Sequence, residues 1–252
     1  MSEPDHRIAG PANAFGPAAA DYERARPSYP AAAIELMVAA LGLGPATRVC
    51  DLAAGTGKLT RLLAATGADV VAVEPVDGMR AELEAACPGV QALDGTAEAI
   101  PLADSSVDVV TVAQAFHWFR FSEALAEITR VLRPGGSLVI VFNERDARVD
   151  WVAAWNEAVE WHSRTIAVYQ ATDWRTLLES AGFSRVQQAE VAWEQPMTRE
   201  LLDARVRSVS YVAQEPPEVQ QDYVDRVVAL AEGFAEPFPL PYRTHLWWAR
   251  RP

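Results

Sequence analysis

The chain has 252 residues, half of them hydrophobic, and a formal net charge of −12. This length and apolar content are enough for a sizeable core, in one large domain or a domain with a cap. The excess of acids repels phosphate backbones and argues against a nucleic-acid partner. Two cysteines, Cys50 and Cys87, are too few for a disulfide framework, so we expect a reducing, cytoplasmic setting.

The sequence carries no signal for membrane or metal binding. Its first residues have no charged and apolar signal-peptide pattern, and no run approaches the ~18 apolar residues of a membrane span. Neither a C-x-x-C motif nor a histidine pair indicates a metal site. We therefore expect a soluble protein without a membrane partner or a metal, and no pattern indicates an oligomer or a partner chain.

The N-terminal segment divides into two parts. Residues 1–20 are rich in alanine, glycine and proline and are expected to be loosely held. The run from Asp21 to Pro30 contains two tyrosines, Tyr22 and Tyr29, with two arginines and two prolines. This composition favours a defined lid, with simple surface packing as the alternative, and a helix is expected over 31–41.

The most informative stretch is a buried strand that leads through a glycine turn into a helix. Apolar residues over Arg48–Leu52 are typical of a strand covered on both faces. Gly55 and Gly57 permit positive φ and a close approach of the backbone to a ligand. The helix expected over Lys58–Ala65 begins with free N–H groups, which favour a polar or anionic ligand group.

Two known loops fit this stretch poorly. A phosphate-binding loop needs G-x-x-x-x-G-K-[ST], but Leu52 occupies the first glycine position and Leu59 the last position. A dinucleotide-binding loop needs G-x-G-x-x-G, and Thr60 stands at the third glycine when the count begins at Gly55. An NAD-dependent oxidoreductase is therefore a weak alternative.

The remaining pattern, D-L-A-A-G-T-G from Asp51 to Gly57, resembles motif I of class I S-adenosylmethionine (SAM) dependent methyltransferases. That family usually has glycine where Ala53 stands, and an alanine is tolerable there if its φ stays negative. The resemblance implies that Asp51, Ala53, Gly55 and Gly57 shape the site of the methionine and ribose of SAM.

Glu74 follows the strand expected over Asp69–Val73 and lies 23 residues after Asp51. An acid at the tip of the second strand, close to this spacing, accepts hydrogen bonds from the two hydroxyls of a ribose. We therefore expect Glu74 to bind the ribose of the cofactor, with a solvated acid at the end of a strand as the alternative.

The loop Gly95–Pro101, after a strand expected over Val90–Leu93, resembles the family's adenine-binding loop. By that resemblance Thr96 and Ala97 meet the adenine ring. Thr96 stands where the family usually has aspartate, and Asp94 is the alternative partner of the adenine amine.

The strand expected over Val107–Ala113 ends in Q-A-F-H-W-F, which resembles the A-x-H-W-F run of a small-molecule branch with trans-aconitate-type methyltransferases. That branch commonly continues with aspartate, where Arg120 stands. The carboxyl end of the strand places Gln114 beside the cofactor, and His117 and Trp118 toward the acceptor. His117 is a candidate general base, because its free pKa lies near 6.5; a satisfied structural histidine is the alternative.

The turn Arg133–Gly136 matches the family's L-R-P-G-G element and precedes a strand expected over Ser137–Phe142. This strand ends in Asn143-Glu-Arg-Asp, again at the ligand edge of the sheet. Asn143 and Arg145 are candidates for binding an acceptor carboxylate, with a loop salt bridge between Arg145 and Asp146 as the alternative.

Strands and helices alternate through residue 142, which predicts a doubly wound parallel sheet. The resemblance implies a Rossmann-like α/β sheet of seven strands with an antiparallel last strand, a helical N-terminal lid and a helical insertion before that strand. The later elements are expected to be helices over 122–132, 151–164 and 173–181, a strand over 185–193, a helical stretch over 198–234 and a last strand over 241–250. We expect one methyltransferase-like domain that comprises a lid and first helix (1–44), a cofactor-binding core (45–145) and acceptor-side helices and strands (146–252).

The leading hypothesis is SAM-dependent methylation of a small-molecule acceptor, at a carboxylate, hydroxyl or carbon of a metabolite. The predicted acceptor pocket consists of Tyr22, Tyr29, His117, Trp118, Asn143 and Arg145. The alternative is a methyltransferase fold that has lost methyl transfer and serves another reaction, or a complex, in secondary metabolism. Ala53, Thr96 and Arg120 support that alternative, because each departs from the family pattern.

Overall fold

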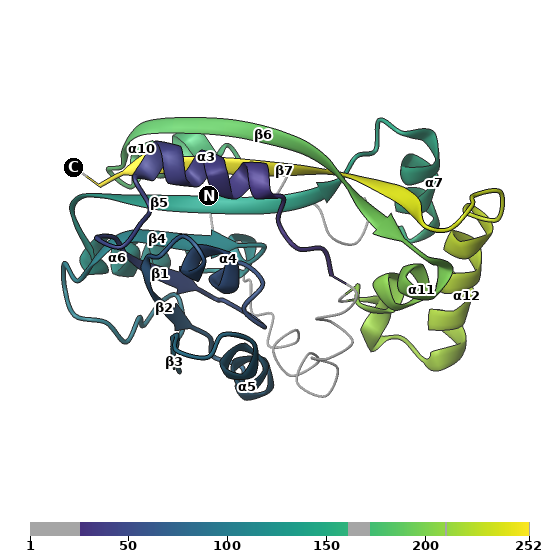
Figure 1. Ribbon diagram of the computed structural model, residues 1–252, viewed down its shortest axis with the longest axis horizontal. Helices are drawn as coiled ribbons and strands as arrows, with labels where there is room; N and C mark the ends of the chain where they lie inside the picture. The colour runs from purple at the N-terminus through teal and green to yellow at the C-terminus, as the bar shows by residue number, and fades with distance from the viewer. Residues whose placement is uncertain (1–25, 161–171, 210, 252) are drawn as a thin grey trace.

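The computed structural model describes residues 26–160, 172–209 and 211–251. Its centre is a seven-stranded sheet with the strand order β3-β2-β1-β4-β5-β7-β6 (Figure 1). The strands are β1 (Arg48–Leu52), β2 (Asp69–Val73), β3 (Gln91–Leu93), β4 (Val107–Ala113), β5 (Leu132–Arg145), β6 (Ser184–Met197) and β7 (Phe238–Arg250).

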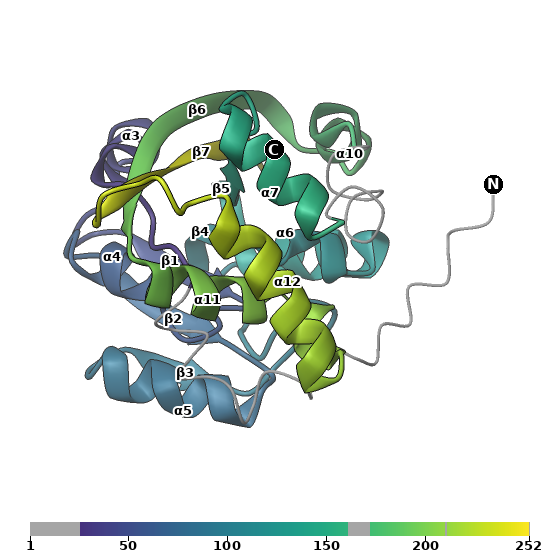
Figure 2. The same ribbon diagram turned by 90° about the vertical axis from the view of Figure 1, so that its right-hand side faces the viewer.

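Helices cover both faces of this sheet, and a further group of helices lies beyond one end of it (Figures 1 and 2). The α-helices are α3 (Ala31–Leu41), α4 (Thr60–Ala64), α5 (Asp77–Ala86), α6 (Phe121–Val131), α7 (Asp150–Ala158), α10 (Trp174–Ser180), α11 (Arg199–Arg207) and α12 (Pro217–Ala229). Short 3-10 turns, η1 (Phe116–Trp118) and η2 (Val212–Gln214), follow β4 and α11. None of the helices in the described ranges has the length and apolar character of a membrane span.

The strand directions confirm the predicted fold class. β1 pairs in parallel with β2 and β4, β2 with β3, and β4 with β5. β7 lies between β5 and β6 and runs antiparallel to both. The chain therefore forms a doubly wound parallel sheet whose last strand in the sequence is antiparallel.

Side chains alternate between the two faces of the central strands, as the pleat of a strand requires. Val49, Val109 and Val139 pack with α3 and α4 on one face. The next residue of each strand packs with α6 and α10 on the other. Because both faces are covered, the central strands are largely apolar, which is why apolar runs in the sequence predicted buried parallel strands.

A second hydrophobic cluster lies beyond the sheet, where β6 and β7 extend toward α7, α11 and α12 (Figure 2). Trp155 of α7, Leu202 of α11, Tyr223 of α12 and Tyr242 of β7 are all buried there. The predicted helical insertion before the last strand is therefore present. This cluster holds α11 beside the carboxyl end of β5, which matters for the functional site.

Some predicted boundaries differ from the structure. The predicted turn Arg133–Gly136 lies inside β5, which begins at Leu132. The cause is the C-terminal segment of the chain: Gly135 donates its N–H to the carbonyl of Arg251, and Arg251 donates to Gly136. The predicted helix over 151–164 extends beyond the described residues, and the part that can be seen, α7, ends at Ala158.

Candidate functional site

A cavity of about 510 Å³ lies at the carboxyl ends of β1, β2, β4 and β5. This is the edge at which open α/β sheets bind ligands. Most predicted site residues line it: Tyr29, Asp51, Ala53, Gly55, Glu74, Thr96, Ala97, Gln114, His117, Trp118, Asn143 and Arg145. Gly57 does not, and Tyr22 lies outside the described residues.

Gly55 and Gly57 have different roles in the turn after β1. Gly55 lies on the cavity wall with φ of 58°. Gly57, with φ of 82°, faces α5: a Cβ there would lie 3.0 Å from Sγ of Cys87 and 3.1 Å from Cγ of Leu83. Gly57 therefore does not line the cavity, and its predicted role in shaping the ligand site stays a prediction. Its missing side chain instead lets α5 approach the turn.

Ala53 adopts a left-handed conformation, with φ of 54°. An alanine is tolerated at this position without strain only if its φ is negative, and here it is positive. An L side chain in this region costs roughly 1–2 kcal/mol. Ala53 thus occupies a position that suits the glycine usual in the resembled motif, and it stores strain on the wall of the cavity.

We expect Ala53→Gly to raise the free energy of unfolding by about 0.5–1 kcal/mol, because the strain relieved exceeds the added entropy of the unfolded chain. Urea denaturation measures this change. Ala54→Gly is the matched control. Because Ala54 has no positive φ, this variant should lower the free energy of unfolding by a similar amount. Destabilisation by both variants would contradict the strain at Ala53.

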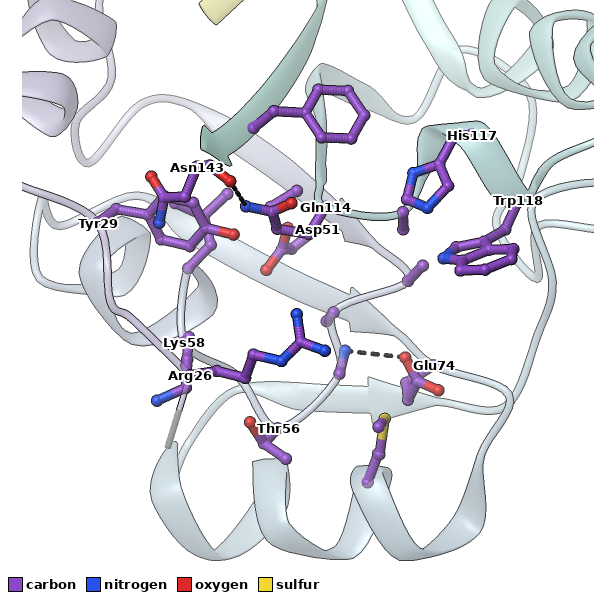
Figure 3. Close-up of a pocket in the computed structure, with 18 of the residues that line it drawn as sticks. Arg26, Tyr29, Asp51, Thr56, Lys58, Glu74, Gln114, His117, Trp118 and Asn143 are labelled. Carbon is purple, nitrogen blue, oxygen red and sulfur yellow. Dashed lines mark hydrogen bonds between the residues drawn. The ribbon is translucent and has the colours of Figure 1, made fainter. Parts of the chain in front are cut away.

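Glu74 lies just after β2 with its carboxylate at the glycine turn (Figure 3). Oε2 accepts a hydrogen bond from the N–H of Gly55 at 2.8 Å, and Oε1 accepts from Val76 at 2.9 Å. Burial raises the pKa of Glu74, while the bonds from Val76 and Gly55 act in the opposite direction. The carboxylate is thus buried and held by backbone donors, which excludes the alternative of a solvated acid.

Asp51 is buried at the end of β1. Its carboxylate accepts hydrogen bonds from the hydroxyls of Thr60 at 2.6 Å and Thr111 at 2.7 Å. Burial raises its pKa to about 6, against the effect of these two bonds and with a smaller contribution from the charge of Glu74. The carboxylate of Asp51 therefore links β1 to α4 through Thr60 and to β4 through Thr111, in the wall of the cavity.

The loop after β3 carries Thr96 and Ala97 to the cavity. The carbonyl of Thr96 accepts from the N–H of Ala99 at 3.2 Å, which closes a tight turn. Asp94, the alternative adenine partner, does not line the cavity; its carboxylate lies 3.5 Å from Arg80. Glu98 accepts a hydrogen bond from the N–H of Arg120 at 3.0 Å and so fixes the loop.

His117 lies in η1, on the side of the cavity opposite Tyr29 (Figure 3). Its ring centroid lies 4.4 Å from that of Trp118 and 5.7 Å from that of Phe142. Nδ1 is buried, and no hydrogen-bond partner for it exists among the described residues. Burial, and then the charge of Arg26, lowers the pKa of His117 to about 4. The imidazole is therefore neutral at pH 7.

Asn143 joins the N-terminal segment to the cavity wall. Its Nδ2 donates to the carbonyl of Ser28 at 2.8 Å, and its Oδ1 accepts from Thr244 at 2.6 Å. Nε2 of Gln114 donates to the backbone carbonyl of Asn143 (Figure 3). Asn143 thus holds Ser28 at the carboxyl end of β5, whereas residues 21–25 of the predicted lid lie outside the described residues.

Arg145 does not form the salt bridge with Asp146 that was the alternative to its binding an acceptor carboxylate. The carboxylate of Asp146 pairs with Arg148, at 2.5–2.7 Å. Arg145 points into the protein instead: its Nε and Nη2 donate to Oδ1 of Asn156, and its guanidinium lies 4.7 Å from the ring centroid of Trp155. The correction follows from the direction of the side chain, which β5 aims at the cluster around α7.

Two further arginines, Arg26 and Arg205, reach the cavity and are not among the predicted site residues. Arg26 points into it in the direction of Glu74 (Figure 3). Its Nη2 donates a hydrogen bond to the carbonyl of Ser208 at 2.5 Å. Arg205 of α11 lies beside Tyr242. A signal for Arg205 exists in the sequence, because it stands in an apolar stripe with Leu202 and Val206 at helical spacing.

Comparison with known proteins decides the family. A family model described as "Methyltransferase domain" matches residues 50–140. An uncharacterized methyltransferase of Mycobacterium tuberculosis (strain ATCC 25618 / H37Rv) is 46% identical over 213 residues, covering 84% of this chain and 83% of that protein. The chain belongs to the class I SAM-dependent methyltransferases. The narrower similarity to trans-aconitate-type enzymes stays a prediction.

Solved structures share the fold of this methyltransferase. A putative methyltransferase from an antibiotic biosynthesis pathway of Anabaena variabilis has a TM-score of 0.62 and 21% identity, covering 88% of this chain and 98% of that one. Geranyl diphosphate C-methyltransferase of Streptomyces coelicolor, solved with S-adenosylhomocysteine (SAH), has a TM-score of 0.52 and 14% identity, covering 88% and 79%. At these identities the likeness concerns the fold alone.

Proposed function

We propose that this methyltransferase transfers the methyl group of SAM to a small-molecule acceptor in the cavity. The observation that carries the proposal is the carboxylate of Glu74, buried beside the N–H of Gly55 at the ligand edge of the sheet. Each oxygen holds one backbone donor and keeps lone-pair capacity for a hydroxyl. A pair of adjacent hydroxyls, as in a ribose, matches this arrangement.

The other cavity residues fit the remaining parts of SAM. The turn of Thr96 and Ala97 offers its backbone to the adenine. Arg26 supplies a positive charge for the methionine carboxylate, and Asp51 a negative one for the methionine ammonium. Ala53 and Gly55 also line the cavity, and neither has a bulky side chain.

The chemistry needs alignment more than activation by the protein. SAM supplies a methyl group on a sulfonium, which an acceptor lone pair takes in line while the sulfur keeps the bonding electrons. The chain's residues therefore serve to position the acceptor and exclude water. His117, Trp118 and Phe142 form an aromatic wall for this purpose, on which a sulfonium cation is also favoured.

The direction of the pKa shift bears on the proposed general base. With a pKa of about 4, His117 is deprotonated at pH 7 and has a lone pair available on a buried nitrogen. It is then a weak base, suited to accept a hydrogen bond from an acceptor hydroxyl rather than to hold its proton. Its role as a base stays a prediction.

Isothermal titration with SAH tests the proposal, after mass spectrometry has checked the purified protein for cofactor carried over. We expect a dissociation constant in the micromolar range or below. Turnover of labelled SAM with candidate acceptors then follows. A folded, ligand-free protein that does not bind SAH would contradict the proposal and favour a methyltransferase fold that serves another reaction.

A further inference from the structure

Gln114 follows the last residue of β4 and lines the cavity in a strained conformation. Its φ is 59°, which lies in the left-handed region that L side chains rarely adopt. A glycine would take this conformation without strain. Strain that persists in a residue on the wall of a ligand cavity is typical of a side chain with a function.

Two hydrogen bonds to β5 hold Gln114 in place. Its backbone N–H donates to the carbonyl of Val141 at 2.9 Å, and Nε2 of its side chain donates to the backbone carbonyl of Asn143 at 3.0 Å. In the sheet, β5 lies on the opposite side of β4 from β1 and β2. The side chain of Gln114 therefore extends away from the part of the sheet that carries Glu74.

The bond to Asn143 determines which way the amide of Gln114 faces. A carbonyl oxygen only accepts hydrogen bonds, so it pairs with the NH₂ end of the amide and not with its oxygen. Oε1 is therefore turned to the other side, and Figure 3 shows it on the side of His117. No residue in the described part of the chain donates a hydrogen bond to Oε1. The cavity thus contains an acceptor atom of fixed position with unused lone pairs.

The aromatic wall lies on the side to which Oε1 is turned (Figure 3). Trp118 lines the cavity and keeps 37% of its surface exposed, and the rings of His117 and Phe142 lie beside each other. An amide oxygen that a ligand shields from water needs a hydrogen-bond donor from that ligand, because an unpaired buried acceptor is costly. The ligand that fits this region has a donor next to an apolar or aromatic portion.

We infer that Gln114 positions the methyl acceptor by accepting a hydrogen bond, at Oε1, from a hydroxyl or an amine of that molecule. This inference rests on the proposed function, because it assigns the part of the cavity at Glu74 to SAM. An ionised carboxylate has no hydrogen to donate and would meet the negative end of the amide dipole. A carboxylate is therefore not the group that Gln114 recognises.

The hydrogen bond fixes the orientation of the acceptor as well as its place, because hydrogen bonds are directional. A hydroxyl that donates its hydrogen to Oε1 has its lone pairs turned away from Gln114, toward the open cavity. An amide oxygen is too weak a base to hold the proton of the acceptor. Gln114 therefore determines position and specificity and does not serve as the general base.

Three probes with the same aromatic body test the inference: 3-phenylpropanol, 3-phenylpropylamine and 1-methoxy-3-phenylpropane, the methyl ether of the alcohol. Each is titrated into the SAH-loaded protein by isothermal titration. We expect the alcohol or the amine to bind at least about fivefold more tightly than the ether, which has no hydrogen to donate. The tighter of the two identifies a hydroxyl or an amine as the group recognised.

Two substitutions of Gln114 separate its oxygen from its structural bond. Gln114→Met removes both, and the preference for the alcohol or the amine over the ether should fall below about twofold. Gln114→Lys keeps a donor for the carbonyl of Asn143 but has no acceptor atom, so the preference for the alcohol should be lost here too. The affinity for SAH should stay unchanged in Gln114→Met, and thermal unfolding of each variant checks that it is folded.

Gln220→Met is the matched control. Nε2 of Gln220 also donates to a backbone carbonyl, that of Glu215 at 2.8 Å, but Gln220 belongs to α12 and does not line the cavity. This variant loses the same kind of side chain and the same kind of bond. It should keep both the preference for a donor and the affinity for SAH.

Equal binding of the ether, no saturable binding of the alcohol or the amine, or a preference that survives Gln114→Met would each overturn the inference. A preference retained in Gln114→Lys would show that the side chain serves only its bond to Asn143, and weaker SAH binding by Gln114→Met would assign it to the cofactor. Either result also overturns the inference. Failure of the proposed function is a separate result, since the wild-type protein would then not bind SAH in the first titration.

Discussion

We expect Glu74→Gln to weaken SAH binding about 100-fold, a loss of roughly 3 kcal/mol. Glutamine fills nearly the same volume as glutamate but lacks the charge, and only one of its two terminal atoms accepts hydrogen bonds. That atom can serve the N–H of Gly55 or of Val76, and not both. The ribose hydroxyls then lose their charged acceptor. Isothermal titration of both proteins with SAH measures the effect.

Glutamine is a sharper test than alanine, because Glu74 also supports the backbone. Removing the carboxylate entirely leaves two buried N–H groups without an acceptor, each at a cost of about 1–3 kcal/mol. A loss of binding in Glu74→Ala then mixes the ribose contact with a change in the turn. The thermal midpoint of Glu74→Gln, measured beside its affinity, separates the two.

Glu98→Gln provides the matched control for Glu74→Gln. Glu98 lies on the same cavity wall, but its carboxylate accepts from the N–H of Arg120, a bond that glutamine retains. The affinity for SAH should change by less than about threefold. An unchanged dissociation constant in Glu74→Gln would contradict the ribose assignment, and equal losses in both variants would point to a general effect of charge.

The sequence predicted the parallel part of the sheet and its ligand edge because those features are local. Each strand from β1 to β4 is a short apolar run that ends in a polar or glycine-rich turn, and such runs can be recognised without tertiary information. Asp51, Glu74 and Gln114 lie at the ends of these strands. Their common location follows from the direction of parallel strands, so the part of the cavity that these three residues line was predictable.

The part of the cavity that Arg205 lines was not predictable in the same way. Arg205 reaches the cavity only because α7, α11 and α12 form a second hydrophobic cluster that holds α11 beside β5. No spacing in the sequence determines how those helices pack. The sequence does show an arginine, Arg205, within an apolar helical stripe. It does not show which part of the protein that stripe packs against.

Two features that the residue types do not predict have a shared cause. The φ of Ala53 and the partner of Arg145 both depend on how the chain leaves a strand, which the residue type does not determine. Alanine favours negative φ, but the turn after β1 imposes 54°. Arg145 and Asp146 are adjacent in sequence, yet the end of β5 directs the arginine to Asn156 and leaves Asp146 to Arg148.

The second large effect that we expect is a dependence of the free energy of unfolding on pH, caused by Asp51. Burial raises its pKa to about 6, against a value near 3.9 in the unfolded chain. The folded protein therefore binds this proton more tightly than the unfolded protein does. The stability that Asp51 contributes is fully present below pH ~4 and is lost as the pH rises through ~6. The difference of about two pKa units corresponds to roughly 3 kcal/mol.

We expect Asp51→Asn to abolish this dependence, because an amide does not titrate. The free energy of unfolding of the variant, relative to wild type, should rise by about 3 kcal/mol from pH 4 to pH 7 in urea denaturation. Thr111→Val is the companion variant: it removes a hydroxyl that donates to the carboxylate at 2.7 Å and holds its pKa down. It should move the loss of stability to higher pH. A pH profile that is the same in wild type and Asp51→Asn would show that Asp51 stays ionised when buried, in which case its negative charge is part of the cavity even below pH 6.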